Sequence, residues 1–246
     1  MTFEGLSPRR IVPLGERLLL LEFADRPGAE VTAAIAAWRA ALEAKPFPGL
    51  VELVPGYTTL GIVYDPLLVT SAAVSEAPLR TESRAFRRVQ AILLEREGEV
   101  RERFAESLRT RAAQISRRIE IPVVYDGMDL PALAERVGLS VEDVVRLHSD
   151  PLYTVYMIGF MPGFPYLGDV PEALRLPRKT TPRARVPAGS VGIAGSQTGI
   201  YPLESPGGWW IIGRTTFVLF DPAADPPATL QSGDRVRFVP VGKVSG

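Results

Sequence analysis

The sequence has no cysteine and a single histidine among its 246 residues. The first absence excludes disulfides, cysteine-based zinc sites and a thiol nucleophile. The second excludes a histidine-rich metal site, and we expect no metal. Lysine occurs only at Lys45, Lys179 and Lys243, which weakens the case for a Schiff base or for the lysine of a phosphate-binding loop.

An excess of charge and a long apolar run are also missing. The 28 basic and 28 acidic residues give a formal net charge of zero, so no global field favours nucleic acid. No uncharged run reaches the ~18 residues that a membrane helix needs. The start, MTFEGLSPRR, lacks the apolar core of a signal peptide. We therefore expect a cytoplasmic protein without nucleic-acid or membrane partners.

Residues 1 to about 66 alternate between strand and helix patterns. One stripe of apolar residues recurs at helical spacing and includes Ile35, Trp38 and Leu42. Strand-like runs lie on both sides of this stripe in the sequence. The expected order is a strand at 9–14, a strand at 17–23, a helix around 31–42, and strands at 50–54 and 57–64. One further helix behind these elements would complete a small sheet covered on one face.

Arginine and glutamate concentrate in residues 80–118, where apolar residues recur at spacings of three, four and seven. This pattern predicts one amphipathic helix, or two that meet at Gly98. The helix could cover the first sheet and expose a charged face. It could instead dock a partner, or a second copy of the chain in a homodimer. An RNA-binding arm is the least favoured interpretation, because the glutamates cancel much of the attraction to phosphate.

Two short helices are expected between 129 and 148. Gly138 should close the first of them. Ser140 should cap the second, with Asp143 at the third helical position in a near capping box.

The stretch 153–215 combines short strand-like runs with dense proline and glycine, which indicates a rigid network of turns. Strand-like runs continue at 216–220 and 235–239, so the pattern favours a barrel or a sandwich. The glycine-rich run 189–195 lacks the lysine and the following helix of a nucleotide-binding loop. We therefore find no ATP motif in the chain.

Arginines lead the candidate site residues in this stretch. Arg178, Lys179, Arg183 and Arg185 cluster around Thr180-Thr181-Pro182. Guanidinium groups match carboxylate or phosphate bidentately, so we predict an anion site with Arg183 and Arg185 in catalytic roles. The alternatives are a solvated basic loop, or arginines paired with acidic residues elsewhere.

A polar, turn-rich unit follows the basic cluster and could line a pocket, with Gln197 and Tyr201 as donors and Trp209 as a wall. The predicted substrate-binding residues are Gln197, Thr198, Tyr201, Glu204, Ser205 and Arg214. His148, at the end of a predicted helix, is a candidate general base. It could equally cap that helix or sit hydrogen-bonded in a core.

Long motifs carry a resemblance to a known family. The runs GFMPGFPYLG, TPRARVPAGSVGIAGSQTGIYP and SPGGWWIIGRT resemble the signature of the family of bacterial 5-oxoprolinase B subunits. That family includes the sporulation-kinase inhibitor, is also called allophanate hydrolase subunit 1, and shares a carboxyltransferase-type domain with urea carboxylase. GERLLLLEF and PGYTTLGIVYDP resemble its first domain, so the resemblance covers nearly the whole chain.

The resemblance implies an α+β fold with two domains. Residues 1–78 would form a small ββαββα sandwich, and residues 79–118 a charged helical linker that packs on it. Residues 119–246 would form a cyclophilin-like β-barrel that carries the signature.

The resemblance also implies an activity held by a complex, namely the ATP-dependent opening of 5-oxoproline to glutamate. The partners would be the A subunit of 5-oxoprolinase, plus a second carboxyltransferase-like protein as its C subunit. The small substrate would be anionic. We expect the isolated chain to be inactive, and Arg183→Ala to lower the activity of the complex far more than stability. The competing functions are inhibition of a sensor histidine kinase, and a carboxyltransferase or allophanate-type role on a urea or amide derivative.

Overall fold

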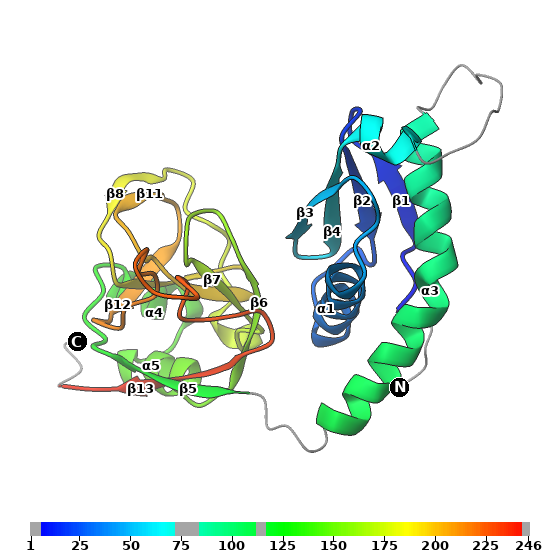
Figure 1. The fold of residues 1–246 in the computed structure, drawn as a ribbon. Coiled ribbons are helices and arrows are strands. Elements are labelled where there is room, and N and C mark those ends of the chain that lie inside the picture. Colours follow the sequence, from blue (N-terminus) through cyan, green and yellow to red (C-terminus); the bar gives the residue numbers. More distant parts are fainter. Residues whose placement is uncertain (1–5, 72–83, 112–116, 243–246) are drawn as a thin grey trace. The chain divides into compact units, whose positions relative to one another are not determined.

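The computed structural model describes residues 6–71, 84–111 and 117–242 (Figure 1). The chain divides into two compact units, Met1–Ile115 and Ser116–Gly246. None of the helices described is both long and apolar enough to cross a membrane.

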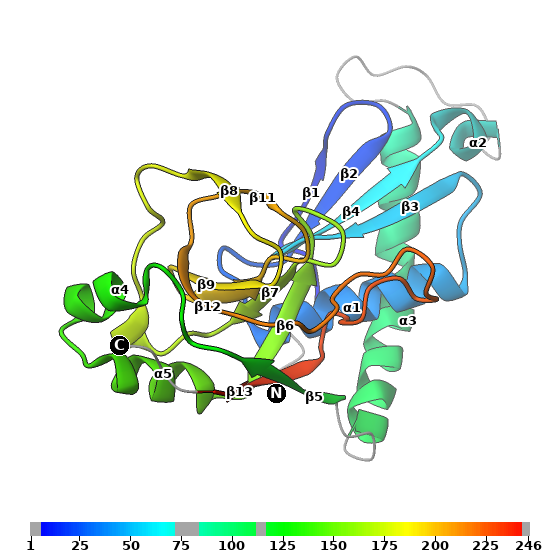
Figure 2. The ribbon, with the colours of Figure 1, turned by 90° about the vertical axis from the view of Figure 1, so that its left-hand side faces the viewer.

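The first unit is built on a four-stranded antiparallel sheet with strand order β1-β2-β4-β3. Its elements are β1 (Arg10–Pro13), β2 (Leu18–Glu22), α1 (Ala29–Ala44), β3 (Leu50–Pro55), β4 (Thr59–Tyr64), α2 (Pro66–Ser71) and α3 (Arg84–Arg111). This order confirms the ββαββ pattern expected from the sequence. Figure 2 shows the strands in front of α1 and α3, which lie on one side of the sheet.

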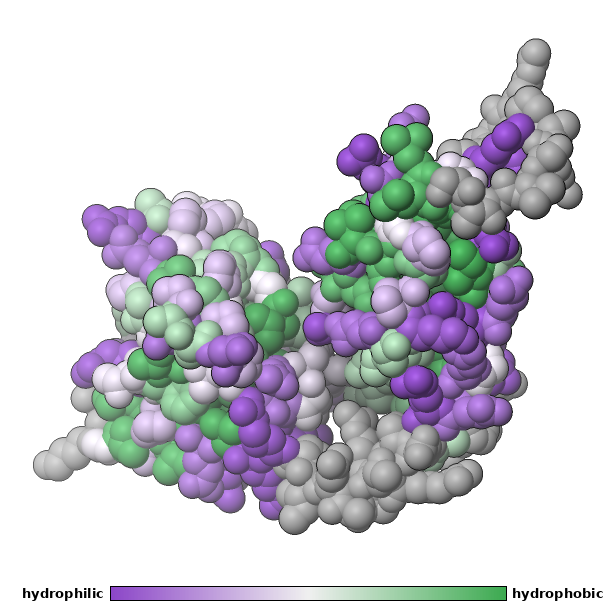
Figure 3. All heavy atoms as spheres, in the orientation of Figure 1, coloured by the Kyte–Doolittle hydropathy of each residue, from purple (hydrophilic) through white to green (hydrophobic). Residues whose placement is uncertain are grey.

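The core of the first unit forms between the sheet and these two helices. Leu19 and Leu21 of β2 point into it, as does Trp38 of α1, whose indole N–H donates to the carbonyl of Leu6 at 2.7 Å. Alternate residues of a strand face opposite sides, so the remaining side chains of each strand lie on the other face of the sheet. Val51 and Val54 of β3 are exposed, and Figure 3 shows hydrophobic residues gathered in the upper part of this unit.

Helix α3 is continuous through Gly98, so the alternative of two helices is wrong. Its apolar stripe belongs to the same core; the buried members are Ala85, Phe86, Val89, Leu93 and Val100. On its charged face Glu97 pairs with Arg101 at 2.7 Å, and Glu99 pairs with Lys45 at 3.2 Å. Helix α3 therefore covers the first sheet and exposes a charged face.

The second unit contains a seven-stranded sheet with strand order β12-β9-β10-β7-β6-β13-β5. The strands are β5 (Arg118–Val123), β6 (Tyr153–Ile158), β7 (Pro165–Gly168), β9 (Ser190–Ala194), β10 (Gln197–Ile200), β12 (Trp210–Arg214) and β13 (Arg235–Pro240). A separate pair is formed by β8 (Arg183–Val186) and β11 (Ser205–Gly207). The helical elements are α4 (Leu130–Val137), α5 (Val141–Ser149) and the short 3-10 helix η2 (Glu172–Leu174).

The two ends of the seven-stranded sheet meet, which makes it a nearly closed barrel. Val124, directly after β5, exchanges two backbone hydrogen bonds of 2.9 Å with Arg214 of β12. The chain then stays against β12, where a Cβ on Gly127 would lie 2.3 Å from the carbonyl carbon of Ile212. Glycine at this position therefore allows the closure.

Local signals define α4 and α5. Gly138 ends α4 in the left-handed conformation (φ 71°), which glycine adopts at little cost. The Ser140 hydroxyl caps α5 by accepting from the amide of Asp143 at 3.0 Å. Both ends were predicted from the sequence.

The prediction of a strand at 216–220 is wrong. Only Phe220 forms a bridge, with Ala228. The amide and the hydroxyl of Thr229 instead donate to the carbonyls of Leu219 and Val218. A proline-rich loop therefore holds this stretch in place of a neighbouring strand.

Candidate functional site

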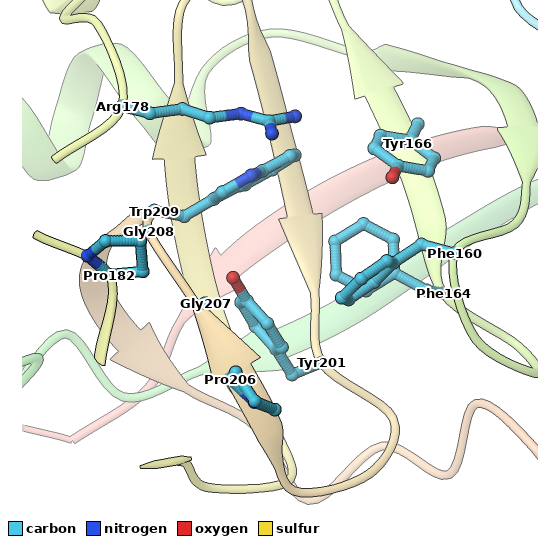
Figure 4. A pocket seen from close by; sticks show the side chains of 10 residues that line it. All are labelled: Phe160, Phe164, Tyr166, Arg178, Pro182, Tyr201, Pro206, Gly207, Gly208 and Trp209. Carbon is cyan, nitrogen blue, oxygen red and sulfur yellow. The ribbon is translucent and has the colours of Figure 1, made fainter. Parts of the chain in front are cut away.

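A pocket of about 200 Å³ opens in the second unit, on the side where β8 and β11 meet the barrel (Figure 4). Pockets for drug-sized ligands are roughly 300–1,000 Å³, so this pocket suits a smaller molecule. Its lining comes from four separate stretches of the chain: Phe160, Phe164, Tyr166, Arg178, Pro182, Tyr201, Pro206, Gly207, Gly208 and Trp209.

Aromatic rings form most of the wall, and Phe164 lies at their centre. Its ring centroid is 4.8 Å from that of Tyr166, 5.2 Å from Tyr201 and 5.5 Å from Trp209. All three contacts are edge-to-face, a geometry that aromatic pairs favour. Phe164 is buried, so the rings around it are held by packing and present fixed faces to the pocket.

Phe160 lies at the edge of the pocket in an unusual conformation. Its backbone φ is 70°, and it is the one non-glycine residue in the described ranges with a positive φ. A bulky residue rarely adopts this conformation, and strain of this kind clusters at functional sites. The Phe160 side chain is 65% exposed, so the strain presents an aromatic ring to solvent beside the cavity.

Tyr201 and Gly207 approach closely within the pocket. A Cβ on Gly207 would lie 2.4 Å from the Tyr201 hydroxyl oxygen, so only glycine leaves room for this ring. Burial raises the pKa of Tyr201, partly offset by the positive charge of Arg178 and by a hydrogen bond from the amide of Trp209. The hydroxyl is therefore protonated at neutral pH, and it can donate a hydrogen bond while its oxygen accepts one from that amide.

Two cations next to the pocket share one carboxylate. Lys179 and Arg183 both donate to Oδ1 of Asp129, at 2.7 and 2.5 Å, and the amide of Ile211 donates to Oδ2 at 2.8 Å. Burial by itself would raise the pKa of Asp129, but these hydrogen bonds outweigh it and hold the pKa below its usual value. Asp129 thereby fixes the segment 179–183 against the barrel.

Arg178 differs from these neighbours. Its side chain extends over the pocket beside Trp209 and toward Tyr166 (Figure 4). Within the described residues it forms no ion pair with a carboxylate. Arg178 is therefore the cation that the structure places at the cavity.

Most of the predicted site residues lie elsewhere. The exposed Arg185 pairs with Glu204 at 2.7 Å, and Arg214 pairs with Asp126 at 2.8 Å. Ser205 Oγ donates to the carbonyl of the next residue at 3.2 Å. None of these five side chains lines the pocket. The structure therefore favours the alternative in which arginines pair with acidic residues.

His148 also lies away from the pocket, in the core of the second unit. It is fully buried, and its ring stacks on Phe238 with centroids 4.6 Å apart. Nδ1 lies 2.8 Å from the Tyr125 hydroxyl, and Nε2 lies 2.8 Å from Thr198 Oγ1. Because the Thr198 hydroxyl donates to the carbonyl of Gly192 at 3.0 Å, its oxygen accepts from Nε2–H, and Nδ1 accepts from Tyr125.

Burial lowers the pKa of His148 to about 3. The ring is thus neutral, fully hydrogen-bonded and out of reach of a ligand in the pocket. This geometry supports the core interpretation of His148 and not the expected general base. Thr198 belongs to the same core network, and Gln197, at the start of β10, is not among the residues lining the pocket.

Two of the sequence-based expectations coincide with the pocket. Tyr201 lines it, and Trp209 forms a wall as expected. The aromatic residues Phe160, Phe164 and Tyr166 were not predicted as site residues, although the run GFMPGFPYLG contains all three. Arg178 was grouped with the other cations of its segment and was given no role of its own.

Comparison with known proteins places the chain in a family. Residues 9–230 match the family described as carboxyltransferase domain, subdomain C and D. The chain is 39% identical to the B subunit of 5-oxoprolinase from Bacillus subtilis (strain 168) over 238 residues, which are 95% of this chain and 93% of that protein. It is 42% identical to the B subunit of 5-oxoprolinase from Escherichia coli O157:H7 over 231 residues, 92% of this chain and 94% of that protein.

Solved structures agree with this placement. The chain is similar to the crystal structure of TTHA0988, with a TM-score of 0.72 and 41% identity, and the match covers 92% of this chain but 40% of that longer one. It shares its fold with Kluyveromyces lactis urea carboxylase (TM-score 0.67, 18% identity), over 94% of this chain and 22% of that one. The chain therefore belongs to the carboxyltransferase domain family of subdomains C and D, together with the 5-oxoprolinase B subunits.

Proposed function

We propose that the chain is the B subunit of an ATP-dependent 5-oxoprolinase, a complex that opens the lactam of 5-oxoproline to give glutamate. The observation that carries this proposal is the match to 5-oxoprolinase B subunits over more than nine-tenths of both chains. The other members of the complex would be an A subunit, plus a second carboxyltransferase-like protein as the C subunit.

The pocket gives this chain a place to act. It is small, walled by aromatic rings and supplied with a cation and a hydroxyl donor. A five-membered lactam is a flat ring with polar edges, which such a pocket can hold and orient. We assign to this chain the binding and orientation of the substrate, which lowers the entropic part of the barrier.

ATP fits this pocket poorly. The cavity of about 200 Å³ has one lining cation, Arg178, whereas nucleotide sites surround a triphosphate with several donors. We therefore assign ATP binding to the other subunits, and the chain alone should be inactive. We also propose a cytoplasmic location, because the reaction needs ATP.

Reconstitution tests the proposal. The three chains are purified together, and glutamate release from 5-oxoproline is measured with and without ATP. We expect release only from the complete set with ATP. Release by this chain alone would refute its dependence on partners. If the assembled set releases no glutamate while the chain blocks autophosphorylation of a sensor kinase, the inhibitor function replaces the enzymatic one.

Variants connect the activity to the pocket. Trp209→Ala removes one wall, and we expect it to lower kcat/KM by about 10-fold or more, the loss expected from removing a packed aromatic contact. Arg214→Gln serves as the control, because this exposed side chain pairs with Asp126 outside the pocket. Equal activities for Trp209→Ala and the control would show that the pocket is not the substrate site.

A further inference from the structure

The cations of the segment 178–185 are not equivalent. Arg185 is paired with Glu204, and Lys179 and Arg183 are paired with Asp129. Arg178, by contrast, has no ion-pair partner in the described part of the chain. Of the four, only Arg178 lines the pocket.

The pairing at Asp129 also leaves positive charge beside the cavity. One carboxylate faces two cations, Lys179 and Arg183, so together these three groups carry one positive charge. Arg178 adds a second. Charges of one sign around a concave, partly desolvated site raise the local concentration of the opposite ion. The immediate surroundings of the pocket therefore favour an anion, although the chain as a whole is neutral.

The charge of Arg178 reaches the interior of the pocket. Burial raises the pKa values of Tyr166 and Tyr201, and in both cases the positive charge of Arg178 acts in the opposite direction. These two hydroxyl groups lie on different sides of the cavity (Figure 4). A carboxylate bound between them would experience the same field.

We propose that the pocket binds a small planar carboxylate, that Arg178 recognises the carboxylate group, and that the aromatic rings pack against the flat part of the molecule. This inference rests on the proposed function and deepens it, since it assigns one group of the substrate to one residue of this chain. A guanidinium group suits this role because its parallel N–H groups match the two oxygens of a carboxylate.

The proposal is tested by measuring the binding of two ligands to the wild type and to two arginine variants. 5-Oxoproline carries a carboxylate, and 2-pyrrolidinone is the same lactam ring without it. Binding of each to the full chain is measured by calorimetry for the wild type, Arg178→Gln and Arg185→Gln. Arg185→Gln is the control, because it removes the same charge from an exposed arginine that does not line the pocket. Circular dichroism melting verifies that each variant is folded.

We expect the wild type and Arg185→Gln to prefer 5-oxoproline over 2-pyrrolidinone by about 10- to 100-fold, the range for a hydrogen bond to a charged group. Arg178→Gln should lose most of that preference while binding 2-pyrrolidinone as the wild type does. The proposal is overturned if Arg178→Gln keeps the preference, or if the wild type shows none.

The two proposals can fail separately. Glutamate release by the reconstituted complex reports on the proposed function whatever the binding experiment gives. If the complex is active and Arg178→Gln keeps the preference for 5-oxoproline, the function stands and another group recognises the carboxylate. If ligand preference depends on Arg178 while the complex is inactive, the pocket is a carboxylate site for a different purpose.

Discussion

Asp129 and Arg183 form an ion pair across the second unit although 54 residues separate them in sequence. Asp129 is 4% exposed and also accepts from Lys179 and from the amide of Ile211. The pair therefore ties the start of α4 to β12 and to the segment that carries Arg178. Arg183 is a positioning residue in this arrangement.

Asp129→Asn should weaken this connection. Removing one partner of a buried ion pair typically costs about 3–5 kcal/mol, and we expect a loss of unfolding free energy near the lower value, because both cations remain partly exposed. Urea unfolding at pH 7 measures it. The same geometry changes the expectation for Arg183→Ala, which should now lower stability together with activity.

The pH dependence gives an independent check of this pair. The pKa of Asp129 is lowered in the folded chain, so its stabilising contribution is complete above the unfolded pKa of about 3.9 and is lost as pH falls through the folded value. The difference in stability between wild type and Asp129→Asn should therefore shrink below about pH 4. A difference that stays constant down to pH 2.5 would contradict the ion pair.

The single histidine makes a second prediction easy to observe. Burial lowers the pKa of His148 to about 3, so its ring resonances in NMR should not titrate between pH 8 and 5. No assignment is needed, because the chain has one histidine. A midpoint near 6.5 would mean an accessible imidazole and would restore the general-base hypothesis.

The same burial links His148 to stability. The unfolded chain takes up a proton near pH 6.5 and the folded chain only near pH 3, so unfolding free energy falls with acidity in this window by up to about 1.4 kcal/mol per pH unit. His148→Gln lacks this titration. Its stability should be lower than that of the wild type at pH 7, and the gap should narrow toward pH 4.

Adjacent glycines in the pocket offer a matched pair of substitutions. In Gly207→Ala the added Cβ would lie 2.4 Å from the Tyr201 hydroxyl oxygen, whereas in Gly208→Ala the nearest atom would be 3.6 Å away. We expect the first to lower unfolding free energy by about 1–3 kcal/mol through overpacking and the second to change it by about 0.5 kcal/mol or less. Equal effects would show that Tyr201 can move aside.

Gly98 and Gly138 allow a second comparison of glycine substitutions. An added Cβ meets nothing within 4 Å at either position, but only Gly138 has a positive φ. Gly98→Ala should therefore stabilise the protein by about 1 kcal/mol, since alanine is the better helix former in α3. Gly138→Ala should destabilise it, because alanine disfavours the left-handed conformation. Urea unfolding followed by circular dichroism distinguishes the two.

Features set by neighbours in sequence could be predicted from the sequence. The stripe of Ile35, Trp38 and Leu42 is buried in α1 as its spacing indicated, and the ends of α4 and α5 follow from Gly138 and Ser140. These signals act within one or two turns of a helix, so they do not depend on the rest of the fold.

The roles of the charged residues could not be predicted in this way. Whether Arg178 or Arg183 faces a ligand depends on where Asp129 lies, and that position is set by closure of the barrel between distant strands. His148 was ambiguous for the same reason, because Thr198, its partner at Nε2, lies 50 residues away in sequence. Sequence spacing holds no information on such pairs.

The hydrogen bonds between Val124 and Arg214 have a consequence for assembly. They pair the backbone of Val124, directly after β5, with that of Arg214 in β12, so the backbone groups of these two residues are not available to a foreign strand. A partner protein meeting this part of the barrel must be recognised through side chains and loop ends. Single substitutions on the barrel surface should then be able to separate assembly from folding.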